Sequence, residues 1–247
     1  MSVERGGIDW MSLGAEIREK ALAIGIDIGK GAEPLFERHA SLLEEWNQWL
    51  NLTRIPKEEV ADKHFLDSLT VLLIPEVERA SRLIDVGTGA GFPGIPLKVA
   101  RPGLDVTLVD SLGKRVKFLE TVVEALNLQG ISCHHARAEE IGGDKEHRET
   151  YDVAVARAVA KLPILCEYLL PLVRLGGVMV AMKGPTGRDE VDEAKEALHI
   201  LGGQVGRIIE TSLPDGDVRQ LVVIEKAKKT PLEYPRRPGM PEKAPLE

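Results

Sequence analysis

The stretch "LIDVGTGAGFPGIPL", residues 83–97, constrains the fold of this chain more than any other feature. A short apolar run that includes Ile84 and Val86 predicts a buried strand, and glycines follow at positions 87, 89 and 91. Alternate glycines directly after a strand predict a strand-to-helix turn where a ligand lies against bare backbone. The dinucleotide pattern G-x-G-x-x-G needs its third glycine where Phe92 stands, so the spacing fits that class of site poorly.

The periodicity of apolar residues predicts an α/β fold preceded by helices. Residues 11 to 74 place apolar side chains at intervals of three and four, which is typical of amphipathic helices. From residue 82 short strand patterns alternate with helical ones, and this predicts a parallel sheet with helices on both faces. The run "QVGRIIETSL", the turn "PDG" and "VRQLVVIEKA" predict a terminal β-hairpin, so the sheet contains an antiparallel strand.

These patterns divide the chain into three expected parts. Residues 1–80 form a helical extension packed on the core, and residues 81–228 form the α/β core. Residues 229–247 form a basic, proline-rich C-terminal arm. A length of 247 residues suits one large domain with a modest extension.

Composition indicates the cellular compartment and excludes some classes of site. No apolar run approaches the roughly 18 residues of a membrane span, and the start lacks the basic and apolar segments of a signal peptide. We expect Cys133 and Cys166 to be reduced core thiols, so we expect a cytoplasmic protein. The histidines show no ligand spacing, and no metal is expected.

The formal net charge of -7 argues against a generic nucleic-acid binder, which would be basic. The charge is uneven, because the first 80 residues are acidic and the tail "KAKKTPLEYPRRPGMPEKAPLE" is basic. Phosphate contacts are local, since screening limits their range to about 8–10 Å. A basic rim on an acidic body can therefore still hold RNA.

The residues after the second and third predicted strands add an adenosine-shaped slot to the glycine turn. Asp110 ends "VTLVD", where a carboxylate can accept both ribose hydroxyl protons, and Ala138 with Glu139 follows near the expected adenine edge. The slot, the glycine spacing and the hairpin favour S-adenosylmethionine over NAD, because this ligand has no pyrophosphate. Asp85 can organise the turn, and Phe92 either walls the pocket or packs the next helix.

Several motifs together identify a family resemblance over nearly the whole chain. "DVGTGAGFPGIPL", "LVDSLGKRVKFL", "ARAEE", "ARAVAKL" and "YPRRPGMP", with "NQWLNLTRI" and "KHFLDSL" upstream, resemble the RsmG (GidB) family of bacterial small-subunit ribosomal RNA guanine-N7 methyltransferases. The resemblance implies a Rossmann-like class I methyltransferase fold with a seven-stranded, mostly parallel sheet. It also implies S-adenosylmethionine as donor and a guanosine of the 530 loop as target.

The resemblance implies a set of cofactor-binding residues. These are Gly87, Gly89 and Phe92 lining the slot, Asp110, Ser111 and Leu112 at the ribose and adenine, Ala138 and Glu139 at the adenine edge, and Arg157 at the end of the fourth strand. Asp85, which can organise the turn, is added to this set from its position alone.

Arg157 is also the tentative catalytic residue, through positioning. Guanine N7 offers an in-plane lone pair, so no proton must leave before methyl transfer and no general base is required. Positioning can then supply about 7–11 kcal/mol of the barrier reduction. Arg157 can orient the base through O6 or a phosphate, or it can simply pair with a carboxylate.

Candidate RNA contacts fall into two groups. The first consists of cations, each of which can equally be an ordinary solvated charge: Lys114, Arg115, Lys183, Arg236 and Arg237. The second shares a predicted helix face or lies just before it: Asn51, Thr53, His64, Asp67 and Ser68. His64, Asp67 and Ser68 predict a capping or substrate-proximal hydrogen-bond network, since one helix cannot arrange a hydrolytic relay. Asn51 and Thr53 join that network or cap the next helix.

The sequence thus predicts an S-adenosylmethionine-dependent methyltransferase acting on small-subunit ribosomal RNA or the 30S particle, as a monomer without a membrane partner. Three alternatives stay open: the same fold acting on a protein or small molecule, an NAD-dependent oxidoreductase, and a non-enzymatic RNA-binding or assembly factor that keeps the cofactor as a structural ligand. Stabilisation by S-adenosylmethionine but not by NAD would separate the cofactors.

Overall fold

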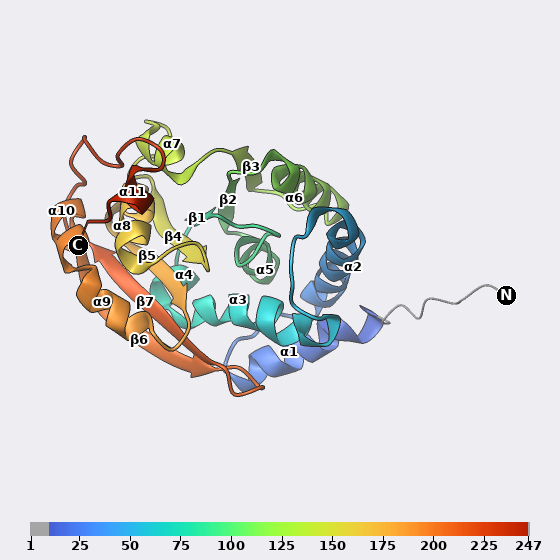
Figure 1. The fold of residues 1–247 in the computed structure, drawn as a ribbon. Coiled ribbons are helices and arrows are strands. Elements are labelled where there is room, and N and C mark those ends of the chain that lie inside the picture. Colours follow the sequence, from blue (N-terminus) through green and yellow to red (C-terminus); the bar gives the residue numbers. More distant parts are fainter. Residues whose placement is uncertain (1–9, 247) are drawn as a thin grey trace.

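The computed structural model describes residues 10–246, which form a seven-stranded sheet with helices on both faces (Figure 1). The strand order is β3-β2-β1-β4-β5-β7-β6. The strands are β1 (Arg82–Val86), β2 (Asp105–Asp110), β3 (Ile131–His135), β4 (Tyr151–Arg157), β5 (Val173–Lys183), β6 (Gly203–Ser212) and β7 (Val218–Lys226). β7 runs antiparallel to both β5 and β6, which confirms the predicted terminal hairpin and the mostly parallel sheet.

The segment before the sheet is helical, as predicted, but its last part is not one helix. The regular helices are α1 (Leu13–Ala23), α2 (Glu33–Leu50), α3 (Asp67–Leu69) and α4 (Pro75–Glu78). Residues 57–73, whose apolar spacing is typical of a helix, instead form a 3₁₀ turn, a π-helical turn over Ala61–Leu66, α3 and a second 3₁₀ turn. Ser68 and Thr70 donate their hydroxyls to backbone carbonyls of the preceding turn, and such bonds compete with a regular helix.

The helices after β1 follow the predicted alternation. They are α5 (Gly94–Ala100), α6 (Gly113–Ala125), α7 (Ala138–Gly143), α8 (Leu162–Leu169), α9 (Gly187–Glu193), α10 (Lys195–Leu201) and α11 (Met240–Lys243). After β5 the helical segment is divided into two short helices, α9 and α10, at the fully buried Ala194.

Two hydrophobic clusters cover the two faces of the sheet, because alternate residues of a strand point to opposite faces. Along β4, Val153 and Val155 join the first cluster, while Ala154 and Ala156 join the second. The first cluster also contains Phe36 and other side chains of the N-terminal helices, so these helices share one core with the sheet. α7, α8 and α10 pack on the second face.

The carboxyl ends of β1, β2, β3 and β4 therefore meet at one edge of the sheet, where the glycine turn lies. Within residues 10–246, no helix is long and apolar enough to cross a membrane. Across that same range, no group of three or more His, Cys, Asp or Glu side chains is arranged to hold a metal ion.

Candidate functional site

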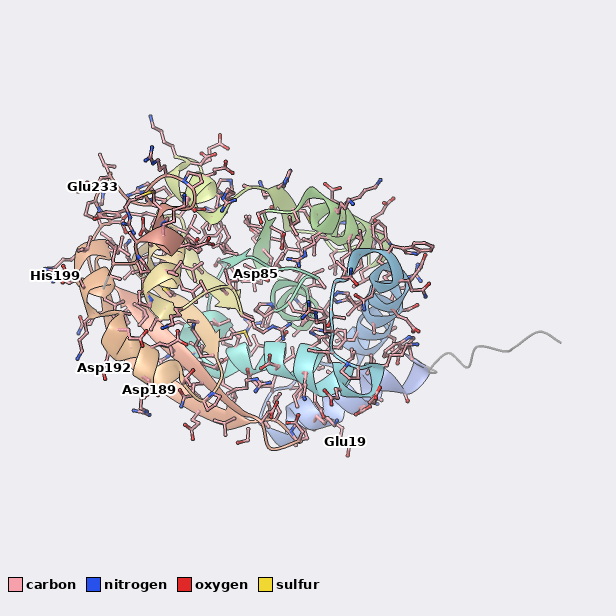
Figure 2. The ribbon with its side chains drawn as sticks, viewed as in Figure 1. Glu19, Asp85, Asp189, Asp192, His199 and Glu233 are labelled. Carbon is pink, nitrogen blue, oxygen red and sulfur yellow. The ribbon has the colours of Figure 1, made fainter. Side chains whose placement is uncertain are left out.

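Asp85 organises the glycine turn from inside the protein. Asp85, labelled in Figure 2, is fully buried. Its Oδ2 accepts the Thr88 hydroxyl at 2.6 Å and the Gly94 N–H at 2.8 Å. Burial raises the pKa of Asp85 to about 6, while Oδ1 has no hydrogen-bond partner in the described chain. The turn itself needs glycine, since Gly87 and Gly89 have φ values of 73° and 60°.

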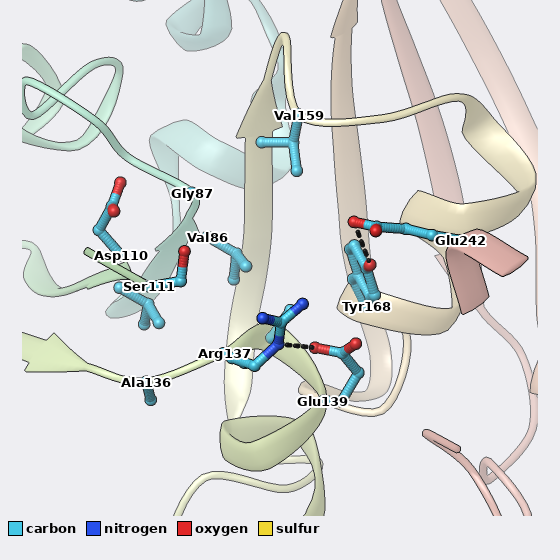
Figure 3. A pocket seen from close by; sticks show the side chains of 12 residues that line it. Val86, Gly87, Asp110, Ser111, Ala136, Arg137, Glu139, Val159, Tyr168 and Glu242 are labelled. Atoms are coloured by element: carbon cyan, nitrogen blue, oxygen red, sulfur yellow. Dashed lines mark hydrogen bonds and ion pairs between the residues drawn. The ribbon is translucent and has the colours of Figure 1, made fainter. Parts of the chain in front are cut away.

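Asp110 ties the turn to the loop after β2. Its Oδ2 accepts the Gly89 N–H at 3.0 Å, and its Oδ1 accepts the Leu112 N–H at 2.9 Å. Beside it lies a cavity of about 110 Å³, hereafter the slot (Figure 3). The slot is lined by Val86, Gly87, Val109, Asp110, Ser111, Ala136, Arg137, Ala138, Glu139, Val159, Tyr168 and Glu242.

The lining of the slot fits a cationic nucleoside. A Cβ at Gly89 would project into open space, whereas a Cβ at Gly87 would lie 2.6 Å from a Val159 methyl, so bare backbone is needed between the turn and the loop after β4. Three carboxylates, of Asp110, Glu139 and Glu242, line the slot with one guanidinium, that of Arg137, and Arg115 lies 3.5 Å from Asp110 outside the lining. This balance attracts a sulfonium and an ammonium and disfavours a pyrophosphate.

Of the cofactor-binding residues predicted from the sequence, some line the slot, some support its lining and some lie outside it. Gly87, Asp110, Ser111, Ala138 and Glu139 line the slot, while Gly89 and Leu112 donate their N–H groups to Asp110. Asp85, Phe92 and Arg157 are not part of the lining. Seven lining residues were not predicted as cofactor-binding: Val86, Val109, Ala136, Arg137, Val159, Tyr168 and Glu242.

A second and larger cavity, hereafter the cleft, lies next to the slot and has a volume of about 790 Å³. It is lined by Thr53, Arg54, Ile55, Lys63, His64, Asp67, Arg157, Ala158, Met182, Lys183, Gly184 and Arg219. The loop after β4 connects the two cavities, since Arg157 and Ala158 line the cleft and Val159 lines the slot. Ala158 has a φ of 55°, a left-handed conformation that costs an alanine roughly 1–2 kcal/mol.

Arg157 is the centre of a hydrogen-bond network at the floor of the cleft. Its Nη1 donates to Asp67 Oδ2 at 2.8 Å and to the Lys63 carbonyl at 3.0 Å. Its Nη2 donates to His64 Nδ1 at 3.1 Å. Arg219 donates from Nε to the other oxygen of Asp67, Oδ1, at 3.1 Å. Both oxygens of the buried Asp67 carboxylate are therefore bound by arginines.

His64 is neutral and holds a defined tautomer. An arginine only donates, so Nδ1 of His64 accepts and Nε2 carries the proton, which it donates to Thr53 Oγ1 at 2.7 Å. Burial and the Arg157 charge lower the pKa of His64 to about 2. The network predicted around His64 and Asp67 thus includes Thr53. The Ser68 hydroxyl lies outside it, because it donates to the His64 carbonyl.

Phe92 lies beneath this network and not in the slot. Its ring stacks between His39 and His64, with centroid distances of 4.8 and 4.3 Å, and the Arg157 guanidinium lies 5.3 Å from its centroid. Burial lowers the pKa of His39 to about 4, although its Nε2 bonds the Ala90 carbonyl at 3.0 Å. Of the two roles considered for Phe92, packing describes its position.

The predicted RNA contacts differ in whether their side chains are paired within the protein or exposed to solvent. Lys183 donates to Glu190 and the Ala160 carbonyl, and Arg115 lies 3.5 Å from Asp110. Arg236 is bound by Glu167, whose side chain is only 1% exposed, so the Arg236 guanidinium has a buried partner within the fold. The remaining candidates are exposed: Lys114, Arg237 and Asn51.

Sequence reasoning missed Arg219 and Lys63 in the cleft. Arg219 meets Asp67 from 152 positions away in the chain, so no local spacing signals the pair. Lys63 is the first residue of the "KHFLDSL" motif, and that position is the one signal that could have identified it.

The chain matches the model of a protein family described as "GidB: rRNA small subunit methyltransferase G" over residues 32–221. Relatives named ribosomal RNA small subunit methyltransferase G are similar over nearly their full length. The one from Pelotomaculum thermopropionicum is 51% identical over 96% of this chain and 100% of its own. The one from Acetivibrio thermocellus is 50% identical over 92% of this chain and 94% of its own.

Solved structures share the fold at low sequence identity. MtNAS, crystallised with S-adenosylmethionine, is 16% identical with a TM-score of 0.52, over 87% of this chain and 78% of its own. A 16S rRNA adenine N1-methyltransferase from Catenulisporales acidiphilia is 17% identical with a TM-score of 0.50, over 64% of this chain and 90% of its own. Both likenesses concern the fold alone.

Proposed function

The chain belongs to the family of rRNA small subunit methyltransferase G, which consists of S-adenosylmethionine-dependent enzymes, and from this premise we propose that it methylates N7 of a guanosine in the 530 loop. The slot would hold the donor, with Asp110 and Ser111 at the ribose and Ala138 at the adenine edge. The cleft would hold the guanine. The loop from Arg157 to Val159 would bring the two together.

The observation that supports the choice of N7 is that Asp67 and His64, the two side chains of the cleft that could serve as a base, already have their polar atoms hydrogen-bonded within residues 10–246. Both Asp67 oxygens accept hydrogen bonds from arginines, and both His64 nitrogens are occupied by Arg157 and Thr53. An exocyclic amine has its lone pair delocalised into the ring, so its attack needs a free acceptor that orients the N–H. N7 needs none, because its lone pair lies in the ring plane and attacks directly.

This chain would then contribute binding and orientation. S-adenosylmethionine supplies an activated methyl group on a sulfonium that leaves readily. Arg157 is held by three partners, so its guanidinium is fixed before the base arrives, and it donates toward an acceptor on the guanine or its phosphate. Fixed geometry of this kind is worth about 7–11 kcal/mol in favourable cases.

The test is transfer of labelled methyl from S-adenosylmethionine to 30S subunits from cells that lack this protein, followed by strand cleavage specific for N7-methylguanosine. We expect cleavage at a single guanosine of the 530 loop. Label on an exocyclic amine, or label that survives without N7-specific cleavage, would contradict the proposal. Naked RNA and precursor particles, assayed in parallel, identify the form of substrate.

An Arg157→Lys variant tests the positioning role. Lysine keeps the charge but cannot bind Asp67, His64 and the Lys63 carbonyl together, so we expect kcat to fall about 10- to 100-fold while the affinity for S-adenosylhomocysteine stays within twofold. A Lys195→Arg variant, an exposed site on α10, is the control for the exchange of cations. Loss of cofactor affinity in Arg157→Lys would instead assign Arg157 to the slot.

A further inference from the structure

Five cationic side chains line the cleft, and they differ in whether the protein already neutralises them. They are Arg54, Lys63, Arg157, Lys183 and Arg219. Arg157 and Arg219 both bind the Asp67 carboxylate, at 2.8 and 3.1 Å. Arg219 also lies 3.4 Å from the carboxylate of Asp217. Each of these two arginines therefore has a carboxylate partner inside the protein.

The two lysines of the cleft are paired as well. Lys63 Nζ lies 2.9 Å from Glu59 and 3.3 Å from Asp215, which belongs to the turn between β6 and β7. Hydrogen bonds to these two carboxylates raise the pKa of Lys63. Lys183 Nζ lies 2.6 Å from Glu190. Four of the five positive charges in the cleft thus have negative partners before any ligand arrives.

Arg54 is the cation of the cleft that keeps its charge uncompensated. Its side chain forms no ion pair and no hydrogen bond with any other residue in the range 10–246. It is exposed to solvent, although it lines the cavity. A guanidinium carries five N–H groups and no acceptor, so all the donors of Arg54 are available to a ligand.

The backbone that carries Arg54 is fixed by its neighbours. The side chain of Asn47 accepts the Thr53 N–H at 2.9 Å and donates to the Thr53 carbonyl at 3.0 Å. The Ile55 N–H donates to the Thr53 hydroxyl at 3.0 Å, and His64 donates to the same hydroxyl at 2.7 Å. The loop is therefore tied to the network at the floor of the cleft, and a ligand need not order it on binding.

The size of the cleft indicates that more than a base enters it. Its volume of about 790 Å³ lies in the range of roughly 300–1,000 Å³ that is typical of sites for drug-sized ligands, so it has room for a nucleotide. A nucleotide within an RNA strand has a phosphate on each side of its sugar. These phosphates are its only anionic groups, and a guanidinium binds phosphate oxygens through two parallel hydrogen bonds.

We propose that Arg54 binds a backbone phosphate of the RNA strand that carries the target guanosine, beside the base held in the cleft. The inference rests on the proposed function, because that function places the guanine there. The four paired cations shape the cleft and fix its floor, whereas Arg54 supplies a charge for the RNA to neutralise. A contact of this kind releases counterions, and one contact with single-stranded RNA contributes about 0.7 to the slope of log K against log salt.

The experiment measures binding of the full chain to 30S subunits from cells that lack this protein, over a series of potassium chloride concentrations at constant magnesium. Arg54→Gln should weaken binding about fivefold near physiological salt and reduce the slope by about 0.7. Arg54→Lys keeps the charge and should restore most of the slope. In the methyl-transfer assay Arg54→Gln should raise KM for the subunits, while kcat and the affinity for S-adenosylhomocysteine stay within about twofold.

Two variants serve as controls. Arg79→Gln removes an exposed arginine that precedes the amino end of β1, at the edge of the sheet opposite the cleft, and should leave the affinity and the slope unchanged. Lys63→Gln removes a charge that is already paired and should reduce the slope less than Arg54→Gln does. An unchanged slope in Arg54→Gln would overturn the assignment even if the affinity falls. A larger loss of slope in Lys63→Gln would move the phosphate to Lys63 and overturn it too.

The same measurements separate this inference from the proposed function. Subunits that gain the N7 methyl group, with an unaltered slope in Arg54→Gln, would leave the function standing and refute the phosphate contact. Subunits that bind with the expected slopes and gain no methyl group would refute the function, and the contact of Arg54 with RNA would stand. Failure of the unmodified protein to bind the subunits would overturn both.

Discussion

At the scale of the residue, the carboxylate of Asp110 connects the glycine turn to the slot. Asp110→Asn would turn an amide NH₂ toward the Gly89 or Leu112 N–H, so one donor would lose its acceptor. Together with the lost charge, this should weaken S-adenosylhomocysteine about 10- to 100-fold in a calorimetric titration. Asp105→Asn, at the other and exposed end of β2, should leave the affinity unchanged. Equal effects of the two substitutions would contradict the role of Asp110.

His39 makes the stability of the protein depend on pH. Burial lowers its pKa from 6.5 to about 4. Between these two pH values His39 is therefore protonated in the unfolded chain and neutral in the folded protein. The stabilisation is complete above the unfolded pKa and is lost as the pH falls through 6.5 toward 4. Between pH 7.5 and 5.5 this one group should cost about 1.4 kcal/mol in the free energy of unfolding.

Urea unfolding at the two pH values measures this loss. His39→Gln provides the comparison, because its amide can still donate to the Ala90 carbonyl but does not titrate. The variant should lose about 1.4 kcal/mol less than the unmodified protein over the same interval. The same loss in both proteins would mean that other groups govern the acid sensitivity.

At the scale of the element, the glycines of the turn have different reasons to be glycine. A Cβ at Gly94, the first residue of α5, would overlap the Leu108 side chain and lie 2.9 Å from Asp85 Oδ2, so Gly94→Ala should destabilise the fold by about 1–3 kcal/mol. A Cβ at Gly89 meets nothing within 4 Å, and Gly89→Ala costs only backbone strain of about 1–2 kcal/mol.

Ligand binding separates the two variants. The added methyl of Gly89→Ala projects into open space beside Asp110, so this variant should bind S-adenosylhomocysteine more weakly than its modest destabilisation explains. Thermal unfolding with and without ligand distinguishes the cases, since ligand raises the midpoint only where it binds. A full ligand-induced shift in Gly89→Ala would place the ligand away from the turn.

The C-terminal arm contains two adjacent arginines whose replacement should affect the stability of the fold to very different extents. Arg236→Ala leaves Glu167 buried without its guanidinium partner and should cost about 3 kcal/mol in the free energy of unfolding. Arg237→Ala, at an exposed position, should change it by less than about 0.5 kcal/mol. Urea titrations of the two variants decide this. Comparable losses would contradict the structural role of the Arg236–Glu167 pair.

The elements that sequence predicted well are those with local signals. The glycine turn, the strand alternation and the terminal hairpin depend on spacing within a few residues, and the structure confirms these elements. Contacts between distant segments carry no such signal. Arg219 meets Asp67 across 152 positions and Tyr168 meets Glu242 across 74, and each looked like an ordinary polar residue. The broken helix before residue 74 was missed because burial and side-chain-to-backbone bonds override helical periodicity.

At the scale of the whole molecule, the N-terminal helices should unfold together with the sheet. Phe36 and Phe65 lie in the same cluster as Phe92 of the turn. All three tryptophans of the chain, at positions 10, 46 and 49, precede the sheet, so their fluorescence reports on the helices, whereas far-ultraviolet circular dichroism reports on the entire fold. The two signals should give one urea midpoint. An earlier fluorescence transition would show that the helices detach independently.

The stack of His39, Phe92 and His64 lies directly below the network that would hold the base. Acid acts on this stack by favouring states in which the two imidazoles leave the interior and take up protons. The acidic limb of an activity profile would then report the loss of the platform under the guanine. Enzymologists who fit such a limb to a single ionisation would obtain a number that belongs to folding and not to proton transfer in the reaction.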